Sequence, residues 1–314
     1  MRKTKVSIIG AGMVGSAVAY TLMQSGLFQE IVILDVNKEK AAGEALDIIH
    51  GAAFVKPLNI ITGDYVDTCN SDIIIITAGA SQKPGETRLD LMERNVAIFK
   101  DIVTNAINRS PNAVFLVVSN PVDILSYITY KIANIESNRV IGSGTVLDSS
   151  RLRYHLGNIL EVDPRNVHAY IIGEHGDSEF AHWSTAFVGA LTLEDYAKNR
   201  LINLEEIKQK VEDDVRTSAQ TIIEKKGYTN YAIAMSVKRI CEAIIRNERS
   251  ILSISSYDPN NDIYYSVPCL VGNTGKIGSI KPSFTKDEKE RLNKTIKVIK
   301  DFTRKLSLWK NYYL

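Results

Sequence analysis

The sequence predicts an α/β fold in which a doubly wound parallel sheet is followed by a mixed α+β domain. Up to about residue 142, short apolar runs alternate with helix-like segments, and this alternation implies crossover units and a parallel sheet. Beyond that point long helical patterns and strands with alternating polarity take over. We therefore expect two domains, residues 1–142 and 143–314, which share a large interface because no low-complexity linker separates them.

In the first half, short apolar runs rich in β-branched residues mark the strands. The run at 72–79 is apolar throughout, which is typical of a central parallel strand covered on both faces. Ser110-Pro111 ends the longest helical pattern, since a residue before proline avoids the helical conformation. Strands are expected at Val6–Gly10, Ile31–Asp35, Asn59–Gly63, Asp72–Gly79 and Ala113–Pro121, and helices at Met13–Ser25, Lys38–His50 and Arg88–Arg109.

In the second half, helical periodicity is longer and strands alternate in polarity. Glycines 272 and 275 provide a turn between such strands. Helices are expected at Ser149–Leu160, Leu204–Lys226, Tyr231–Arg246 and Thr285–Leu308, and strands at 167–172 (VHAYII), Ile251–Tyr257 and Ile263–Val271.

The composition excludes several classes of protein. With 38 basic and 36 acidic side chains the net charge is only +2, which gives no electrostatic case for a nucleic-acid or membrane partner. The three cysteines are widely spaced, so neither a disulfide framework nor a zinc cluster is expected, and no metal is predicted. No run is long enough to span a bilayer, and the chain enters a strand at once, without room for a signal peptide. A cytoplasmic location is expected.

The first candidate site is Gly10-Ala11-Gly12-Met13-Val14-Gly15, a GxGxxG sequence. Alone it could be an ordinary turn, but here it lies between an expected strand and helix, and Asp35 ends the next strand. This combination is the dinucleotide fingerprint of the Rossmann fold. Asp35 should accept hydrogen bonds from the adenosine ribose and repel a 2′-phosphate, so NAD is expected over NADP, unless Asp35 is merely a strand-end turn residue.

Four further segments accompany this fingerprint: GASQKPGETRLDLMERN (79–95), VSNPVD (118–123), GTVLDSSRLR (144–153) and IIGEHGDSE (171–179). Together the five resemble the L-lactate and malate dehydrogenase family over essentially the whole chain. The resemblance implies an enzyme with an NAD-binding first domain and a substrate-binding, catalytic second domain. The cofactor-binding positions it implies are Gly10, Gly12, Val14, Gly15, Asp35, Lys40, Tyr65, Gly79, Ala80, Val118, Ser119, Asn120 and Ser143.

The resemblance also assigns catalytic roles. His175 matches the proton donor and acceptor, a task that suits an imidazole because it titrates near neutrality. Asp148 matches the carboxylate partner of that histidine, although it could simply cap the following helix. Arg151 matches the residue that holds the substrate carboxylate through two parallel hydrogen bonds; it could instead be a surface ion pair. Gly173 and Gly176, which have no side chains, can leave space for the substrate and the nicotinamide beside the imidazole ring of His175.

Other positions complete the implied pocket. Arg88 matches the cation that polarises the ketone oxygen of the substrate. It ends a segment that contains two glycines and a proline and resembles a mobile lid. Alternatively, Arg88 simply belongs to the first turn of a helix. Asn120 matches a contact to nicotinamide ribose and substrate, or ends a strand in a turn. Thr229 and Ile233 match residues that close the far side, with a helix cap and a core residue as the alternatives.

The substrate is indicated by Gln82 in the lid. In the family, malate enzymes carry arginine at this position and lactate enzymes carry glutamine. Burying the second carboxylate of oxaloacetate without a countercharge would be unfavourable, so the resemblance implies reversible reduction of pyruvate to L-lactate, the last step of anaerobic glycolysis. Malate or a branched-chain 2-hydroxy acid remains the alternative, because one or two methylenes discriminate weakly.

Two basic residues have no catalytic task. Arg153 lies two residues after Arg151, and His168 lies in the expected strand before the active-site turn. Many bacterial lactate dehydrogenases have arginine and histidine at these positions and bind fructose 1,6-bisphosphate there, across a subunit interface. The resemblance therefore implies an allosteric homotetramer. The alternative is one solvated arginine and one histidine at the edge of the core.

Overall fold

A computed structural model describes residues 3–80, 85 and 88–307 of the chain. Within them a nine-stranded sheet has the order β14-β13-β12-β6-β5-β4-β1-β2-β3. The strands from β6 to β3 pair in parallel, whereas β12, β13 and β14 pair antiparallel. The strands of this sheet are β1 Lys5–Ile9, β2 Glu30–Leu34, β3 Asn59–Thr62, β4 Ile73–Ile76, β5 Val114–Val117, β6 Val140–Gly142, β12 Ser250–Asp258, β13 Ile263–Gly272 and β14 Gly275–Ser279.

Helices cover both faces of the parallel part, as the doubly wound prediction requires. The four isoleucines of β4 are all fully buried. The first hydrophobic cluster joins one sheet face to residues of α1, α2 and α8, and the second joins the other face to α3, α4 and α9. These helices are α1 Met13–Ser25, α2 Lys38–Ile49, α3 Arg88–Arg109, α4 Val122–Ala133, α8 Tyr231–Ile245 and α9 Lys286–Ser307.

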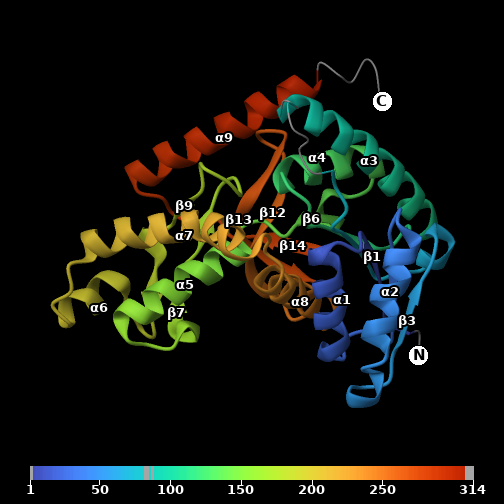
Figure 1. The fold of residues 1–314 in the computed structure, drawn as a ribbon. Helices are drawn as coiled ribbons and strands as arrows, with labels where there is room; N and C mark the ends of the chain where they lie inside the picture. Colours follow the sequence, from blue (N-terminus) through green and yellow to red (C-terminus); the bar gives the residue numbers. More distant parts are fainter. Residues whose placement is uncertain (1–2, 81–84, 86–87, 308–314) are drawn as a thin grey trace.

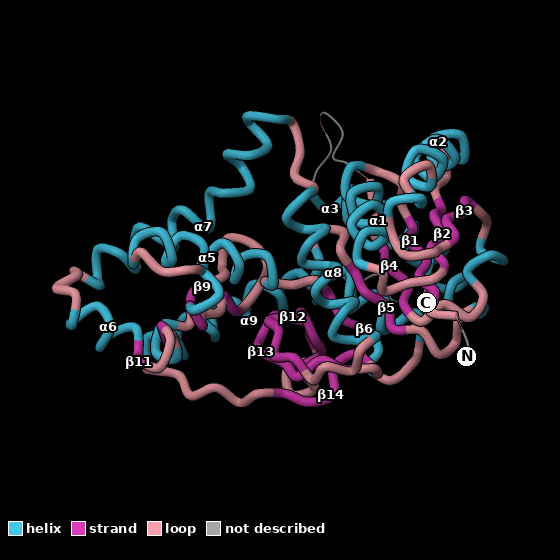
Figure 2. The backbone as a smooth tube through the Cα atoms, turned by 90° about the horizontal axis from the view of Figure 1, so that it is seen from below, coloured by secondary structure: helices cyan, strands magenta, loops and turns pink. Residues whose placement is uncertain are grey.

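A third hydrophobic cluster lies in the second half, where α5 packs against α7. This part extends away from the large sheet (Figures 1 and 2). Its remaining elements are α5 Val146–Leu160, α6 Leu193–Asn199, α7 Leu204–Lys226, β7 Val167–His168, β8 Ile171–Ile172, β9 Phe180–Ala181, β10 Phe187–Val188 and β11 Leu191–Thr192. Short 3-10 helices occur at Ala52–Phe54, Tyr65–Thr68, Ser137–Arg139, Pro164–Asn166 and Trp183–Thr185.

The two halves share the large sheet. Ser255 of β12 pairs antiparallel with Gly142 of β6, so the antiparallel hairpin of the second half extends the parallel sheet of the first. A Cβ at position 142 would approach the Ser255 Cβ to 2.8 Å, so this junction requires glycine. The large shared interface expected from the missing linker is therefore present.

Two expectations about elements were wrong. The run VHAYII is not one strand, because β7 pairs with β10 in a three-stranded sheet while β8 pairs with β9 in another. Helix α5 begins at Val146 with Thr145 as its N-cap residue, so Asp148 lies in the first turn and is not the cap. In the described part of the chain, no helix is both long and apolar enough to cross a membrane.

Candidate active site

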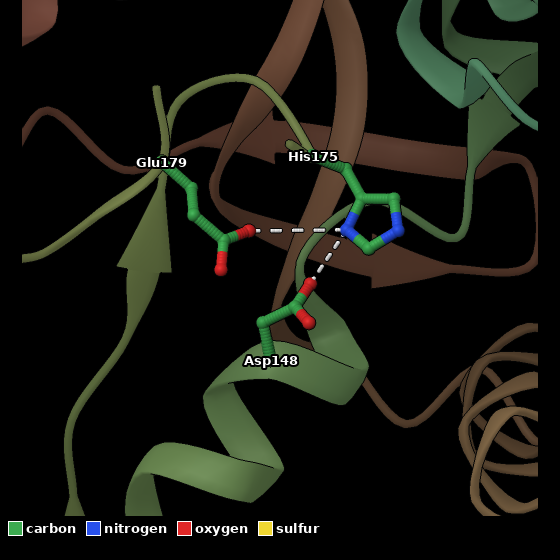
Figure 3. A group of neighbouring side chains, drawn as sticks. All are labelled: Asp148, His175 and Glu179. Atoms are coloured by element: carbon green, nitrogen blue, oxygen red, sulfur yellow. Dashed lines mark hydrogen bonds and ion pairs between the residues drawn. The ribbon is translucent and has the colours of Figure 1, made fainter. Parts of the chain in front are cut away.

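His175 and Asp148 form the centre of the candidate site (Figure 3). His175 lies in the loop between β8 and β9, and its Nδ1 is 2.7 Å from Oδ2 of Asp148. The other carboxylate oxygen, Oδ1, accepts a hydrogen bond of 2.8 Å from Nη1 of Arg151. The Asp148 side chain is only 2% exposed, whereas that of His175 is 27% exposed. One buried carboxylate therefore joins an accessible imidazole to a guanidinium.

Hydrogen bonds from hydroxyl groups place Asp148 beside the histidine loop. Thr145, the N-cap residue of α5, donates from its Oγ1 to the carbonyl of Ile171 in β8 at 2.6 Å. Ser149 accepts a hydrogen bond from the backbone N–H of Ile171 at 3.0 Å. These bonds fix the first turn of α5 against β8, the strand that leads into His175. A carboxylate in the first turn of a helix is also stabilised by the helix dipole.

The electrostatic environment favours a charged pair. Burial opposes the imidazolium form of His175, but the charge and hydrogen bond of Asp148, followed by the charges of Glu179 and Asp123, outweigh it and raise the pKa of His175 to about 9. Burial likewise opposes ionised Asp148, yet His175 and Arg151 hold its pKa below the usual range. The pair can therefore deliver a proton from the imidazole ring to an oxygen atom at neutral pH.

Glu179 is a member of this cluster that the sequence analysis missed. Its Oε2 lies 3.8 Å from Nδ1 of His175, and its side chain is 8% exposed (Figure 3). Burial and the neighbouring charge of Asp148 raise its pKa well above the usual range. Its position four residues after His175, in GEHGDSE, was the available signal.

The same three residues could also hold a metal ion by their spacing, since one ligand atom of each lies within 4.8 Å of the others. However, Asp148 already accepts a hydrogen bond from Arg151. A cation beside that guanidinium would be repelled. The arrangement therefore suits proton transfer better than metal binding.

The two glycines beside His175 have different surroundings. Gly173 has a φ of +101° and a Cβ there would lie 3.0 Å from Oγ1 of Thr295 in α9. The missing side chain of Gly173 therefore leaves room for Thr295 of α9. At Gly176 the nearest atoms to a Cβ belong to Glu174, the nearest at 3.4 Å.

The remaining predicted substrate residues lie at different places in the chain. Gln82 lies outside the described residues. Arg88 is the first residue of α3, but its side chain is not among those described. Asn120 is exposed just beyond the carboxyl end of β5. Thr229 is half-buried between α7 and α8, and Ile233 of α8 packs partly buried against the first hydrophobic cluster.

A cavity of about 660 Å³ lies at the carboxyl ends of β1, β2 and β4. Five of the expected cofactor residues line it: Gly10, Gly12, Asp35, Tyr65 and Gly79. Further lining residues that the sequence analysis missed include Lys38 and Asp101. Lys38 pairs with Asp64 at 2.7 Å, and the hydroxyl of Tyr65 donates to Asp101 at 3.1 Å.

The glycine geometry fits a dinucleotide in this cavity. A Cβ at Gly15 would lie 1.8 Å from the carbonyl oxygen of Gly10, so α1 can approach β1 only with glycine there. A Cβ at exposed Gly12 would meet no protein atom within 4 Å, which leaves its backbone open to a ligand at the N-terminus of α1. Asp35 accepts from the backbone N–H of Ala11 at 2.6 Å, so its carboxylate is held beside the same turn.

Other expected cofactor residues do not line this cavity. Lys40 is exposed on α2 and does not line the cavity, whereas Lys38 does. Ser119 is buried and donates to the carbonyl of Ala78 at 2.6 Å, and Ala80 donates its N–H to Asn95 at 2.8 Å. Both therefore stabilise neighbouring strand ends. The remaining residues outside the lining are Val14, Gly15, Val118, Asn120 and Ser143.

Arg153 and His168 are brought to one corner of the second half. Nε of Arg153 donates to the carbonyl of Ala169 at 3.1 Å, and its guanidinium lies 5.0 Å from the centre of the Tyr170 ring. His168, the neighbour of Ala169, is exposed on β7. The Arg153 and His168 side chains thus flank the same short backbone segment, and Arg153 bonds to a different partner from Arg151.

Comparisons with known proteins agree with this arrangement. The NAD binding domain model of lactate/malate dehydrogenase matches residues 4–142, and the alpha/beta C-terminal domain model matches residues 145–307. L-lactate dehydrogenase 1 of Clostridium acetobutylicum is 52% identical over 305 residues, which cover 96% of this chain and 97% of that protein. The L-lactate dehydrogenase of Clostridium perfringens is 50% identical over 305 residues, with 95% and 96% covered.

Solved structures show the same relationship. A lactate dehydrogenase from a deep-sea metagenome library of the Medee basin superposes with a TM-score of 0.95 at 40% identity, covering 98% of this chain and 100% of that one. The minor L-lactate dehydrogenase of Enterococcus mundtii gives 0.92 at 39% identity, covering 95% and 98%. The fold, the Asp148–His175 pair and these matches over nearly the full length together show that the chain belongs to the lactate/malate dehydrogenase family.

Proposed function

We propose that this protein is an NAD-dependent L-lactate dehydrogenase, which reduces pyruvate to L-lactate and oxidises L-lactate in reverse. The observation that carries the proposal is the shared carboxylate of Asp148, bonded to His175 on one oxygen and to Arg151 on the other. A 2-oxo acid presents a ketone oxygen and a carboxylate on adjacent carbons. A proton donor and a guanidinium held by one buried group match those two functional groups.

Each of the chain's own residues then has a task. NADH, when bound, supplies the hydride that reaches the ketone carbon. The imidazolium of His175 gives a proton to the ketone oxygen, and Asp148 fixes the ring tautomer and stabilises the charged form. The guanidinium N–H groups of Arg151 that do not bond Asp148 pair with the substrate carboxylate. Arg88 polarises the ketone, Gln82 selects against a second carboxylate in the substrate, and Asn120 and Thr229 contact the substrate.

The cofactor is NAD. Oδ2 of Asp35 accepts from Ala11 and Oδ1 accepts from the backbone N–H of Asn37 at 2.9 Å. Each carboxylate oxygen keeps a lone pair for a ribose hydroxyl, and the negative charge opposes a 2′-phosphate. We further propose that residues 1–142 bind NAD and residues 143–314 bind substrate, and that the enzyme acts in the cytoplasm at the last step of anaerobic glycolysis.

The proposal is tested by following NADH oxidation with pyruvate, oxaloacetate and 2-oxoisocaproate as alternative substrates. The highest kcat/KM is expected for pyruvate. A preference for oxaloacetate would make the protein a malate dehydrogenase, and a preference for 2-oxoisocaproate would make it a branched-chain 2-hydroxy acid dehydrogenase. Absence of turnover with all three, at intact NADH binding, would contradict an enzymatic role.

The raised pKa of His175 predicts opposite pH profiles for the two directions. Reduction needs the imidazolium, so kcat/KM for pyruvate should be level at lower pH and fall as the pH rises through about 9. Oxidation needs the neutral ring, so kcat/KM for L-lactate should rise over the same interval. Initial rates across pH in both directions check this. If kcat/KM in both directions changed around pH 6.5, the ordinary pKa of histidine, Asp148 would not be holding the proton on the ring.

Gln82→Arg is expected to change the substrate preference. The new cation would pair with the second carboxylate of oxaloacetate, whereas with pyruvate it would have no such partner. A hydrogen bond to a charged group contributes about 1.5–3 kcal/mol, so the ratio of kcat/KM for oxaloacetate to that for pyruvate should rise at least about tenfold. Gln82→Lys gives a matched control for charge without the guanidinium fork. If neither variant moves the ratio, Gln82 does not face the distal carbon of the substrate.

We also propose a homotetramer activated by fructose 1,6-bisphosphate at Arg153 and His168. A two-fold axis that brings both residues together with their symmetry mates would concentrate positive charge, which a bisphosphate neutralises. Because Arg153 shares α5 with Asp148 and Arg151, effector and pyruvate binding should strengthen each other by linkage.

The measurement is the pyruvate concentration at half-saturation, with and without the effector, for wild type, Arg153→Gln and His168→Ala. The effector should lower this concentration in wild type and much less in either variant. Sedimentation at low protein concentration should show that the effector favours tetramers. No response in wild type would refute activation, and a full response in both variants would place the effector elsewhere.

A further inference from the structure

A second buried carboxylate, Asp123, touches the histidine loop and has no role so far. It is the second residue of α4 and only 3% exposed. Its Oδ2 accepts a hydrogen bond of 2.8 Å from the backbone N–H of His175. Its Oδ1 accepts one of 2.5 Å from the hydroxyl of Ser255 in β12. Both oxygens are therefore used, and the carboxylate joins three segments that are far apart in sequence.

These contacts hold His175 from its backbone, while Asp148 holds it from its ring. Both aspartates lie in the first turn of a helix, Asp123 in α4 and Asp148 in α5. The imidazole ring is thus anchored at Nδ1 by one carboxylate, and the residue that carries it is anchored at its N–H by another. Rotation of the side chain and displacement of the backbone are restrained separately.

Asp123 also connects the histidine to the first half of the chain. Helix α4 starts directly after Asn120-Pro121, at the carboxyl end of β5, where ligands bind in doubly wound sheets. The loop around His175 is held on its other side by α9, because Thr295 accepts the N–H of Glu174 at 2.8 Å. Without Asp123, the loop would keep its attachment to α9 but lose its attachment to the strand end beside the cofactor half.

Burial makes the ionised form of the Asp123 carboxylate unfavourable. Burial, together with the nearby charge of Glu174, raises the pKa of Asp123 to about 6. The hydrogen bonds from Ser255 and His175 and the charge of His175 act in the opposite direction. At neutral pH the carboxylate is ionised, and its negative charge is one of those that raise the pKa of His175. A neutral amide would offer an acceptor for the same N–H without that charge.

We infer that Asp123 is a positioning residue for the proton transfer: it fixes the backbone of His175 relative to the strand end of the first half and favours the imidazolium by its charge. This inference rests on the proposed function, since it names the proton donor that Asp123 positions. It predicts two separable effects, one from the lost acceptor and one from the lost charge.

The test compares Asp123→Ala, Asp123→Asn and Ser255→Ala with wild type. Asp123→Ala removes the acceptor and the charge, so kcat for pyruvate reduction should fall about 10–100-fold, the scale expected when a reacting group is displaced by about 1 Å. The KM for NADH should change little. Asp123→Asn keeps an acceptor and should recover most of the lost kcat. Ser255→Ala leaves the bond to His175 intact and controls for disturbance of the buried contact, so its kcat should stay closest to wild type.

The charge effect is measured without catalysis, by NMR titration of the imidazole ring of His175. The chain has five histidines, and the signal of His175 is identified by its loss in His175→Asn. The pKa of His175 should be lower in both Asp123 variants than in wild type, and closest to wild type in Ser255→Ala. This readout remains valid if the protein does not reduce pyruvate, so failure of the proposed function is distinguishable from failure of this inference.

The outcomes decide between positioning and a purely structural role. If Asp123→Ala unfolds, the decision passes to Asp123→Asn, which must lower the pKa of His175 while the protein stays folded. A folded Asp123→Ala variant with wild-type kcat, or an Asp123→Asn variant with an unchanged His175 pKa, would overturn the inference. Equal loss of kcat in Asp123→Ala and Ser255→Ala would show that packing around β12 matters, and would also overturn it.

Discussion

His175→Ala is expected to lower kcat/KM for pyruvate by about 10²–10⁴-fold, the usual contribution of a general acid. Asp148 bonds the imidazole at Nδ1, and the ring is partly exposed, so it can exchange a proton with a bound substrate. NADH binding should stay close to wild type, because the cavity expected to hold the dinucleotide is lined by residues of the first half. Steady-state kinetics and NADH fluorescence titration measure the two effects.

The matched control is His50→Ala, which removes an exposed histidine that follows α2 and lies outside both sites. It should leave both quantities unchanged. Pyruvate reduction by His175→Ala within a few-fold of wild type would refute the assignment of His175 as proton donor.

Asp148→Asn is expected to have the second-largest effect, a loss of kcat/KM of at least about 10²-fold. The amide preserves size but removes the charge that favours the imidazolium, and it can hold the ring in the wrong tautomer. It also removes the ion pair with Arg151, so the KM for pyruvate should rise as well. The pH at which pyruvate reduction declines should move below about 9, because Asp148 is the main group that raises the pKa of His175.

Glu179→Gln is the matched control for Asp148→Asn, since it also neutralises a buried carboxylate near His175, at 3.8 Å rather than 2.7 Å. Because Oε2 of Glu179 lies too far from Nδ1 of His175 for a hydrogen bond, the substitution should cost much less activity than Asp148→Asn. Equal losses in the two variants would mean that general electrostatics, and not the Asp148 hydrogen bond, governs the histidine.

The fold could be predicted largely from the sequence because its strongest signals are local. The run at β4 contains four consecutive isoleucines, and the helices α1, α3 and α7 have the bounds that periodicity predicted. Helix α4 was missed because it follows the buried strand β5 after only a short proline turn. The division of VHAYII into β7 and β8 was also missed, because pairing with β10 and β9 is decided by distant residues.

The residues of the candidate site could be predicted from the sequence, but the hydrogen bonds between them could not. Asp148, Arg151 and His175 were identified from motifs, yet the bonding of both Asp148 oxygens depends on how α5 packs on β8. Asp123 stood within a recognised motif without a role, because its partners His175 and Ser255 are 52 and 132 residues away in sequence. Spacing along the chain carries no information about such long-range contacts.

The most direct test of the central claim is the product formed from pyruvate and NADH. The account predicts L-lactate as the product, one molecule for each NADH oxidised, when the reaction mixture is resolved by chiral chromatography. Formation should depend on His175 and be nearly absent with His175→Ala. D-lactate as the main product, or no lactate while oxaloacetate is reduced rapidly, would contradict the account.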